Sequence, residues 1–143
     1  MCIRDSIKID TASQKFLEKT RIAVLSTVNK HNMPHSVPIW YSWDQGEAFM
    51  FTGINTQKWK NLLQNPFATL CVDDREPPYQ SVIIHGKVEQ VQIPINQFVK
   101  SLSVKYYGLT EGVEFSNLYR DNAKDVVIFK LVPSKIISEL HKA

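Results

Sequence analysis

The sequence has few cysteines, no long apolar run and no strong excess of either charge, and each shortage excludes a class of protein. The 2 cysteines, Cys2 and Cys71, are too few for a disulfide framework, so we expect free thiols without a catalytic role and a buried Cys71. No segment approaches the ~20 apolar residues of a membrane span, and MCIRDSIKID lacks the apolar core of a secretory signal. These observations predict a cytoplasmic protein without a membrane partner, in which residues 1–9 are a disordered or artefactual leader.

Charge, glycine and histidine patterns exclude further classes. A net charge of +3 from scattered basic residues does not favour a nucleic-acid partner. The 5 glycines form neither G-x-G-x-x-G nor a P-loop, and no G-x-S-x-G elbow occurs. The 4 histidines are far apart and none has a Cys or His at ligand spacing, so we expect no metal site. The adjacent carboxylates Asp73 and Asp74 would point to opposite faces of a strand and are expected to be solvated, not catalytic.

The sequence does contain many short β-type segments and a few helices. With 143 residues, 43% of them hydrophobic, it fits a single domain, 1–143. Runs of β-formers between turn residues predict strands at 21–28, 34–43, 48–52, 68–73, 79–91, 126–131 and 136–137. Helical spacing predicts helices at 10–19, 56–65, 94–107 and 114–122. The predicted fold class is therefore mainly β (α+β), a small barrel of six or seven mostly antiparallel strands with helices at its openings.

Single residues refine this prediction. Pro34 and Pro38 each remove a ladder donor, so the 34–43 strand should lie at a sheet edge or be irregular. Gly86 marks a bulge or sharp bend in the 79–91 strand. If the 34–43 strand is regular, Trp40 lies on one face and Tyr41 with Trp43 on the other. A strand that is apolar on both faces needs a second cover, which could be a second subunit, a planar ligand, or both.

The stretch from Phe49 to Leu70 combines a strand, a polar loop, a helix and a second strand. Thr56 is the expected N-cap, because its hydroxyl can accept a bond from a free backbone N–H. Lys58 falls in the first helical turn, where the helix dipole and open N–H groups favour an anion such as phosphate. An ordinary β–α–β connection with a solvated lysine would give the same pattern. The helix should bury an apolar stripe of Trp59, Leu62 and Leu63.

An ordered set of segments is recognisable: HSVPIWYSWD, a hairpin, FTGINTQKWKNLLQNPFATLCVDD and PPYQSVIIHGKVEQV. Together they resemble the flavin and deazaflavin oxidoreductases related to pyridoxamine 5′-phosphate oxidase, from about Phe16 to Glu89 and more weakly as far as FKLVPSKI. No single motif is diagnostic, but the order of the set is. The resemblance implies an FMN-binding split β-barrel and an obligate homodimer with two cofactor sites in the grooves between subunits.

The resemblance also implies site residues. Lys58 matches the family's phosphate-binding lysine, and Thr52 matches the hydroxyl residue that ends the preceding strand. Gln80 matches the position at which many relatives have a polar or basic residue that reaches the cofactor across the dimer. In the family, the backbone of one strand runs along the tricyclic ring of the cofactor. The residues that match this strand are Ser36, Val37, Pro38, Ile39 and Trp40. Trp59 is the last member of the candidate cofactor-binding set. No catalytic residue is identified.

The implied cofactor is FMN or the deazaflavin coenzyme (factor 420), and the segments IWYSWD and QKWKNL are similar to the deazaflavin-dependent branch. The implied function is hydride transfer between this cofactor and an unknown small-molecule substrate. The alternative is a flavin, haem or tetrapyrrole carrier of the same fold without turnover. Many relatives have an arginine near the phosphate-binding lysine or directly after the tyrosine that matches Tyr79. The residues found there in this sequence are Gln57, Lys60 and Gln80. It also ends ISELHKA, without the segment by which pyridoxamine phosphate oxidases help to bind their substrate.

Overall fold

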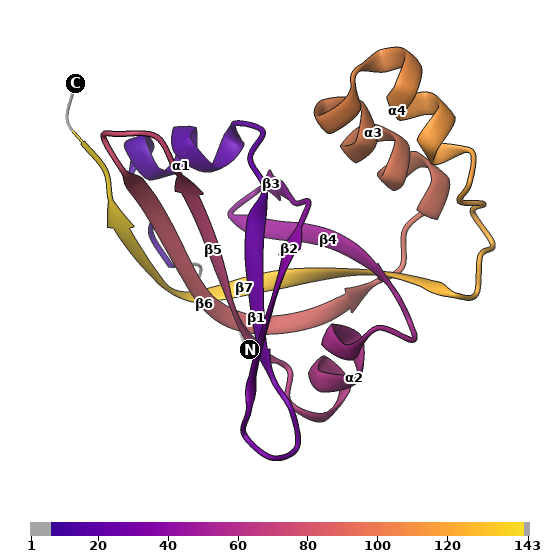
Figure 1. The fold of residues 1–143 in the computed structure, drawn as a ribbon, viewed down its shortest axis with the longest axis horizontal. Coiled ribbons are helices and arrows are strands. Elements are labelled where there is room, and N and C mark those ends of the chain that lie inside the picture. Colours follow the sequence, from indigo (N-terminus) through magenta and orange to yellow (C-terminus); the bar gives the residue numbers. More distant parts are fainter. Residues whose placement is uncertain (1–6, 142–143) are drawn as a thin grey trace, which may run out of the picture.

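The β-type segments pair into one seven-stranded antiparallel sheet that curls into a split barrel (Figure 1). The structure is a computed structural model and describes residues 7–141. The strands are β1 Ala23–Val28, β2 Pro34–Ile39, β3 Ser42–Asp44, β4 Glu47–Gly53, β5 Phe67–Asp74, β6 Gln80–Val91 and β7 Val126–Glu139. The helices are α1 Thr11–Glu18, α2 Gln57–Gln64, α3 Ile95–Tyr107 and α4 Leu109–Ser116. This confirms the mainly β prediction and its strand number.

The strand order is β2-β1-β5-β6-β7-β4-β3, so β2 and β3 lie at opposite edges of the sheet. Pro34 and Pro38 therefore lie on an edge strand, as predicted. The single strand predicted over 34–43 is divided into β2 and β3, because Trp40 and Tyr41 leave the ladder and carry the chain from one edge to the other. The Tyr41 side chain enters the core, where its hydroxyl donates to the Leu17 carbonyl at 2.8 Å. Trp40 lies half-buried against α3 and α4.

Helix α1 packs near β3 at one end of the barrel (Figure 1). Asp10 is its N-cap, and its carboxylate accepts a hydrogen bond from the Ser13 amide at 2.7 Å. Phe16 and Leu17 of this helix are buried in the core. Ile9 packs against the core, although residues 1–9 were predicted to be disordered or artefactual. Residues 1–6, including Cys2, lie outside the described residues.

Strands β6 and β7 form the longest pairing in the sheet, and its register shifts between His85 and Gly86. This confirms the bulge predicted at Gly86. Opposite it lies Pro133, which has no N–H to donate to the ladder. The two closing strands predicted from the sequence are one continuous strand, because the bulge accommodates this proline.

Helix α2 begins after Thr56 and buries a face that includes Trp59, Asn61 and Leu62. The Asn61 side chain donates to the hydroxyl of Thr27 on β1 at 3.0 Å, which turns the helix toward that strand. Leu63, predicted to be buried, is 68% exposed. The prediction failed because it counted apolar residues only, and the buried amide of Asn61 rotates the contact face away from Leu63.

Helices α3 and α4 form a hairpin that stands to one side of the barrel (Figure 1). The sequence predicted α3 but placed the next helix at 114–122, whereas α4 begins at Leu109, directly after Gly108 at a φ of +87°. The two helices touch through their backbones at Gly112, where an added Cβ would lie 2.5 Å from the Cα of Val104. The Ser103 hydroxyl donates to the Gly112 carbonyl at 2.7 Å and fixes this contact.

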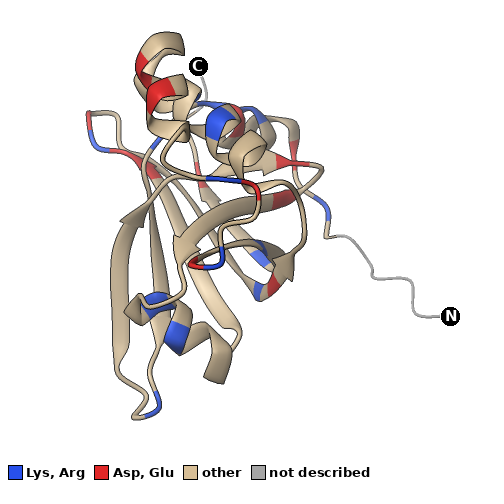
Figure 2. Cartoon of the chain, turned by 90° about the vertical axis from the view of Figure 1, so that its right-hand side faces the viewer, with Lys and Arg blue, Asp and Glu red and all other residues tan. Residues whose placement is uncertain are grey.

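Acidic and basic residues are interspersed over strands, loops and helices (Figure 2). Within residues 7–141, no helix is both long enough and apolar enough to cross a membrane. Cys71 is a free thiol but is only half-buried, so the prediction of a buried side chain is wrong. It points to the outer face of β5, because the side chains of Leu70 and Val72 fill the inner face.

Candidate functional site

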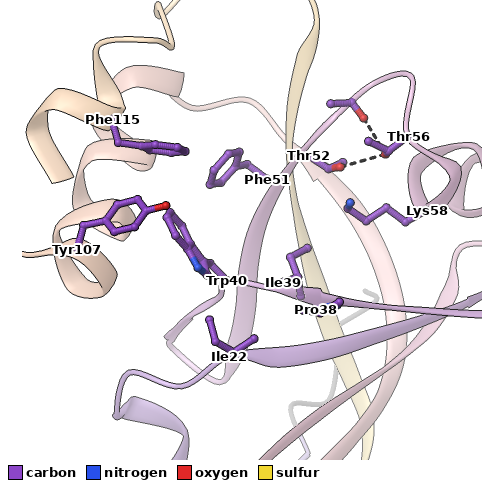
Figure 3. Close-up of a pocket in the computed structure, with 11 residues that line it drawn as sticks. Ile22, Pro38, Ile39, Trp40, Phe51, Thr52, Thr56, Lys58, Tyr107 and Phe115 are labelled. Atoms are coloured by element: carbon purple, nitrogen blue, oxygen red, sulfur yellow. Dashed lines mark hydrogen bonds between the residues drawn. The ribbon is translucent and has the colours of Figure 1, made fainter. Parts of the chain in front are cut away.

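A pocket of about 360 Å³ lies between β2, β4, the start of α2 and the α3–α4 hairpin (Figure 3). Its polar side chains gather at the α2 end, and its aromatic side chains gather at the hairpin end (Figure 3). The pocket is lined by Ile22, Pro38, Ile39, Trp40, Phe51, Thr52, Gly53, Thr56, Lys58, Tyr107 and Phe115.

The polar end is organised by the hydroxyl of Thr56. This hydroxyl donates to the Gly53 carbonyl at 2.9 Å and accepts from the Trp59 amide at 3.4 Å, so Thr56 is the predicted N-cap. Thr52, which is 4% exposed, has its hydroxyl 3.0 Å from that of Thr56. Because the Thr56 proton is already used on Gly53, Thr52 must be the donor of this pair. Thr52 therefore supports the cap and has no second proton to offer a ligand.

Lys58 supplies the positive charge of this end. It lies in the first turn of α2 on the half-buried side, and burial lowers the pKa of its ammonium group. Within the described chain no carboxylate pairs with Lys58. The Trp59 amide donates to the hydroxyl of Thr56. The amides of Gln57 and Lys58 have no acceptor within the helix, because the first intrahelical hydrogen bond is the one donated by the next residue after Trp59. An ammonium group without a counter-ion beside open amides is suited to a phosphate-sized anion.

The opposite end is an aromatic wall. The ring of Trp40 is stacked on Tyr106, with centroids 4.8 Å apart and planes 5° from parallel. Tyr107 meets Trp40 edge-on at 5.0 Å, and Phe115 meets it at 5.4 Å. Phe51 stands across from these residues in Figure 3. Such a surface can hold a conjugated ring by stacking and by excluding water.

The sequence profile described as pyridoxamine 5′-phosphate oxidase matches residues 9–138. The chain belongs to that family. No curated protein sequence matches it significantly.

Solved structures share the fold at low identity. A conserved hypothetical protein from Mycobacterium tuberculosis superposes with a TM-score of 0.75 at 22% identity, over 96% of this chain and 89% of that one. An F420 reductase gives 0.68 at 24% identity, with 90% and 98% covered. The haem storage protein HutZ from Vibrio cholerae gives 0.67 at 14% identity, with 92% and 94% covered.

The structure brings together five of the predicted cofactor-binding residues and separates four. Those that line the pocket are Pro38, Ile39, Trp40, Thr52 and Lys58. Ser36 and Val37 lie on β2 outside the pocket lining, and the Ser36 hydroxyl bonds that of Ser26 at 2.8 Å. Trp59 is buried against Phe129 in the core, so its side chain does not belong to this site. Gln80 lies in a different groove, where its amide donates to Asp74 at 3.2 Å and accepts from the His141 amide at 3.1 Å.

At the aromatic end of the pocket, the sequence interpretation identified Trp40 but missed Phe51, Tyr107 and Phe115. Tyr107 and Phe115 come from the hairpin, which lies far along the chain from β2 and β4. Phe51 was assigned only to a strand, although its neighbour Thr52 was singled out. The adjacent Tyr106 and Tyr107 at the end of a helix were an available signal, because aromatic side chains bury large areas and dominate core and interface contacts.

Proposed function

We propose that this protein binds the phosphate of FMN or of the deazaflavin coenzyme (factor 420) at Lys58 and catalyses hydride transfer to or from a small organic substrate. The observation that carries this proposal is the half-buried Lys58, which lacks an anionic partner in the described chain and stands at the head of an aromatic pocket. Family membership and the F420 reductase fold support a flavin-type cofactor.

The residues present fit such a group. Lys58 and the first-turn amides of α2 would hold the phosphate, and Thr52 would act indirectly by fixing the cap at Thr56. Pro38, Ile39 and Trp40 would lie along the ring system and exclude water from it. The cofactor, when bound, supplies the redox chemistry, while the chain binds and orients the reactants. Ser36, Val37 and Gln80 remain proposed contacts, and for Gln80 the contact would be made across a dimer.

The first test is to identify the cofactor. We expect the purified protein to bind FMN or the deazaflavin coenzyme, detected by the absorption spectrum and mass of co-purified material and by fluorescence titration. Riboflavin is the matched control because it has the FMN ring without the phosphate. Loss of a charge-assisted contact of about 1.5–3 kcal/mol should weaken its binding at least tenfold. Equal affinity for FMN and riboflavin would show that no phosphate site exists.

The same preparation separates an enzyme from a carrier. If the protein is an oxidoreductase, reduced bound cofactor is reoxidised faster when an organic acceptor is added. The fold similarity to a haem storage protein makes the carrier the second candidate. Tight binding of haem without turnover of any flavin-type cofactor would favour it.

We also propose that the protein is a homodimer. The prediction assigned the second cover of Trp40 to another subunit or a ligand, but α3 and α4 of the same chain supply much of this cover. A different surface supports dimerisation. Strand registers place five apolar side chains in one row across the outer face of five strands: Pro38, Val24, Cys71, Ile83 and Ile137. A continuous apolar row of this kind favours association of two copies.

Light scattering at micromolar concentration is expected to give twice the chain mass. Ile83→Asp places a charge within the outer row and should shift the protein to monomer, because burying an unpaired carboxylate is costly. Leu118→Asp, at a highly exposed position outside this row, is the control and should leave the dimer intact. A wild-type monomer would refute the dimer and remove the proposed role of Gln80.

A further inference from the structure

One end of the barrel carries only basic charge and also exposes apolar side chains. This basic tip is made of the turn between β1 and β2, the later part of α2, the start of β5 and the neighbouring residue of β6 (Figure 1). Its exposed side chains are Lys30, Met33, Lys60, Leu63, Phe67 and Lys87. We propose that the basic tip docks on the surface of an anionic phospholipid bilayer. This goes beyond the proposed function, because none of these residues lines the cofactor pocket.

The segments of the basic tip meet in one place. Val28, the last residue of β1, pairs with Pro34, the first of β2, so the turn between them projects beyond the sheet. Phe67 begins β5 and pairs in register with Lys87 of β6, which places both side chains on the same face. A groove of about 290 Å³ joins Val28, Pro34 and Phe67 to Asn65, which directly follows α2. The basic tip is therefore one continuous surface.

Charge is the first argument. Acidic and basic residues are interspersed over the rest of the molecule, but the three segments that include the basic tip, 19–43, 48–72 and 77–88, contain no Asp or Glu. In Figure 2 only blue is seen over the β1–β2 turn and α2. The one carboxylate of β6, Glu89, pairs in register with Lys130 of β7. An anionic surface is therefore attracted to this end without repulsion from acidic side chains of the basic tip.

The apolar side chains among these lysines are the second argument. Met33 and Phe67 are each 61% exposed, and Leu63 is 68% exposed. Lys60 and Leu63 are three residues apart on α2, so they share one face of the helix. A single exposed apolar residue is ordinary, but apolar and lysine side chains mixed on one surface suit a membrane interface. The apolar groups enter the boundary between headgroups and acyl chains, while the lysine stems let the ammonium groups reach the phosphates.

The residue types favour a lipid surface over other anionic partners. Lysine supplies the charge of the basic tip, whereas protein interfaces are depleted in lysine and enriched in arginine. Nucleic-acid sites favour arginine and several stacked aromatic rings, and the basic tip has one such ring, Phe67. Attraction to an anionic leaflet depends on charge near the surface and needs no fixed geometry. The sequence prediction of no membrane partner considered spanning segments and secretory signals only, and a peripheral surface requires neither.

The test is binding of the purified protein to lipid vesicles, measured by flotation. Vesicles of phosphatidylcholine alone are compared with vesicles of equal parts phosphatidylcholine and phosphatidylglycerol. We expect at least about tenfold tighter binding to the anionic vesicles, most of which is lost at about 0.5 M salt. Lys30→Ala and Lys60→Ala should each weaken this binding about fivefold, because each removes one charge from the membrane surface. Lys15→Ala removes the same charge from α1, at the other end of the barrel, and should weaken it less than about twofold.

A second set of variants separates a bilayer from other anionic partners. Met33→Ser and Leu63→Ser should each weaken vesicle binding at least about threefold at both salt concentrations, because burial of apolar surface is not screened by salt. Leu118→Ser is the matched control, since Leu118 is 76% exposed and lies outside the basic tip, and it should have no effect. Thermal unfolding of all these variants should match wild type, because each position is exposed.

Three results would overturn the inference: equal binding to the two kinds of vesicle, equal effects of Lys60→Ala and Lys15→Ala, or no effect of Met33→Ser and Leu63→Ser. Tighter binding to a DNA duplex than to the anionic vesicles would also overturn it, because the partner would then be a nucleic acid. The proposed function is tested separately, since it depends on Lys58. We expect Lys60→Ala to weaken vesicle binding while cofactor affinity stays nearly unchanged.

Discussion

Replacing Lys58 with alanine is expected to weaken binding of FMN or the deazaflavin coenzyme tenfold to a hundredfold. The ammonium group is half-buried, has no carboxylate partner in the described chain and stands beside the first-turn amides of α2. A charge-assisted contact with phosphate is worth about 1.5–3 kcal/mol, and each 1.4 kcal/mol is about a tenfold change in affinity. Fluorescence titration of the purified protein measures the change. The melting temperature of the ligand-free protein should hardly move, because Lys58 makes no ion pair that folding would lose.

Lys60→Ala is the matched control for this variant. Lys60 is exposed and lies about 200° around α2 from Lys58, so it adds the same charge to the protein without facing the pocket. Its removal should change affinity less than about twofold, as expected for a screened surface charge. Equal losses in the two variants would mean that general electrostatics, and not a specific phosphate site, attracts the cofactor.

Gly86→Ala is expected to destabilise the fold more than any other single methyl addition at the described glycines of the sheet. The new Cβ would lie 2.2 Å from the Val132 carbonyl oxygen and 3.1 Å from the Cα of Pro133, both in the backbone of β7. Because backbone cannot rotate away as a side chain can, β6 and β7 must separate locally. We expect a loss of about 3 kcal/mol, at the upper end of overpacking costs, and a melting temperature lower by roughly 10 °C.

Gly53→Ala is the control for that variant. Its Cβ would meet only ordinary contacts, with the Thr56 Cγ2 at 3.6 Å and the Asp125 carbonyl at 3.8 Å. Thermal unfolding of this variant should remain within about 2 °C of wild type, since such changes alter stability by little. A Gly86→Ala protein that melts with wild type would show that the bulge can open without cost.

Much of the fold could be predicted because local chemistry decides it. Prolines cannot donate to a ladder, which placed Pro34 and Pro38 at an edge, and Gly86 was the one residue in its strand suited to a bulge. The break at Trp40 and Tyr41 could not be predicted, because it depends on Tyr41 entering the core and on Tyr106 receiving Trp40. Both contacts join residues far apart in the sequence.

The candidate site also has one part that the sequence could predict and one part that it could not. Its polar end lies within seven consecutive residues, from Thr52 to Lys58, so a cap and a helix start were enough to predict it. Its aromatic end is assembled from β2, β4 and the hairpin, and only tertiary packing brings these together. Thr52 illustrates a finer limit. The resemblance to the family suggested Thr52 as a ligand, but its hydrogen bonds show that its hydroxyl proton is donated to Thr56.

The strand order has a consequence for the order in which the chain can fold during synthesis. β7 is made last, yet it lies between β6 and β4 and joins the β2-β1-β5-β6 group to the β4-β3 pair. While β7 is still inside the ribosome, both groups expose an unpaired edge, and β4 has only the three residues of β3 as a ladder partner. Long-range pairing is slow, and exposed edges invite association with other chains. We therefore expect the nascent chain to be most prone to association with other chains in the interval before β7 emerges.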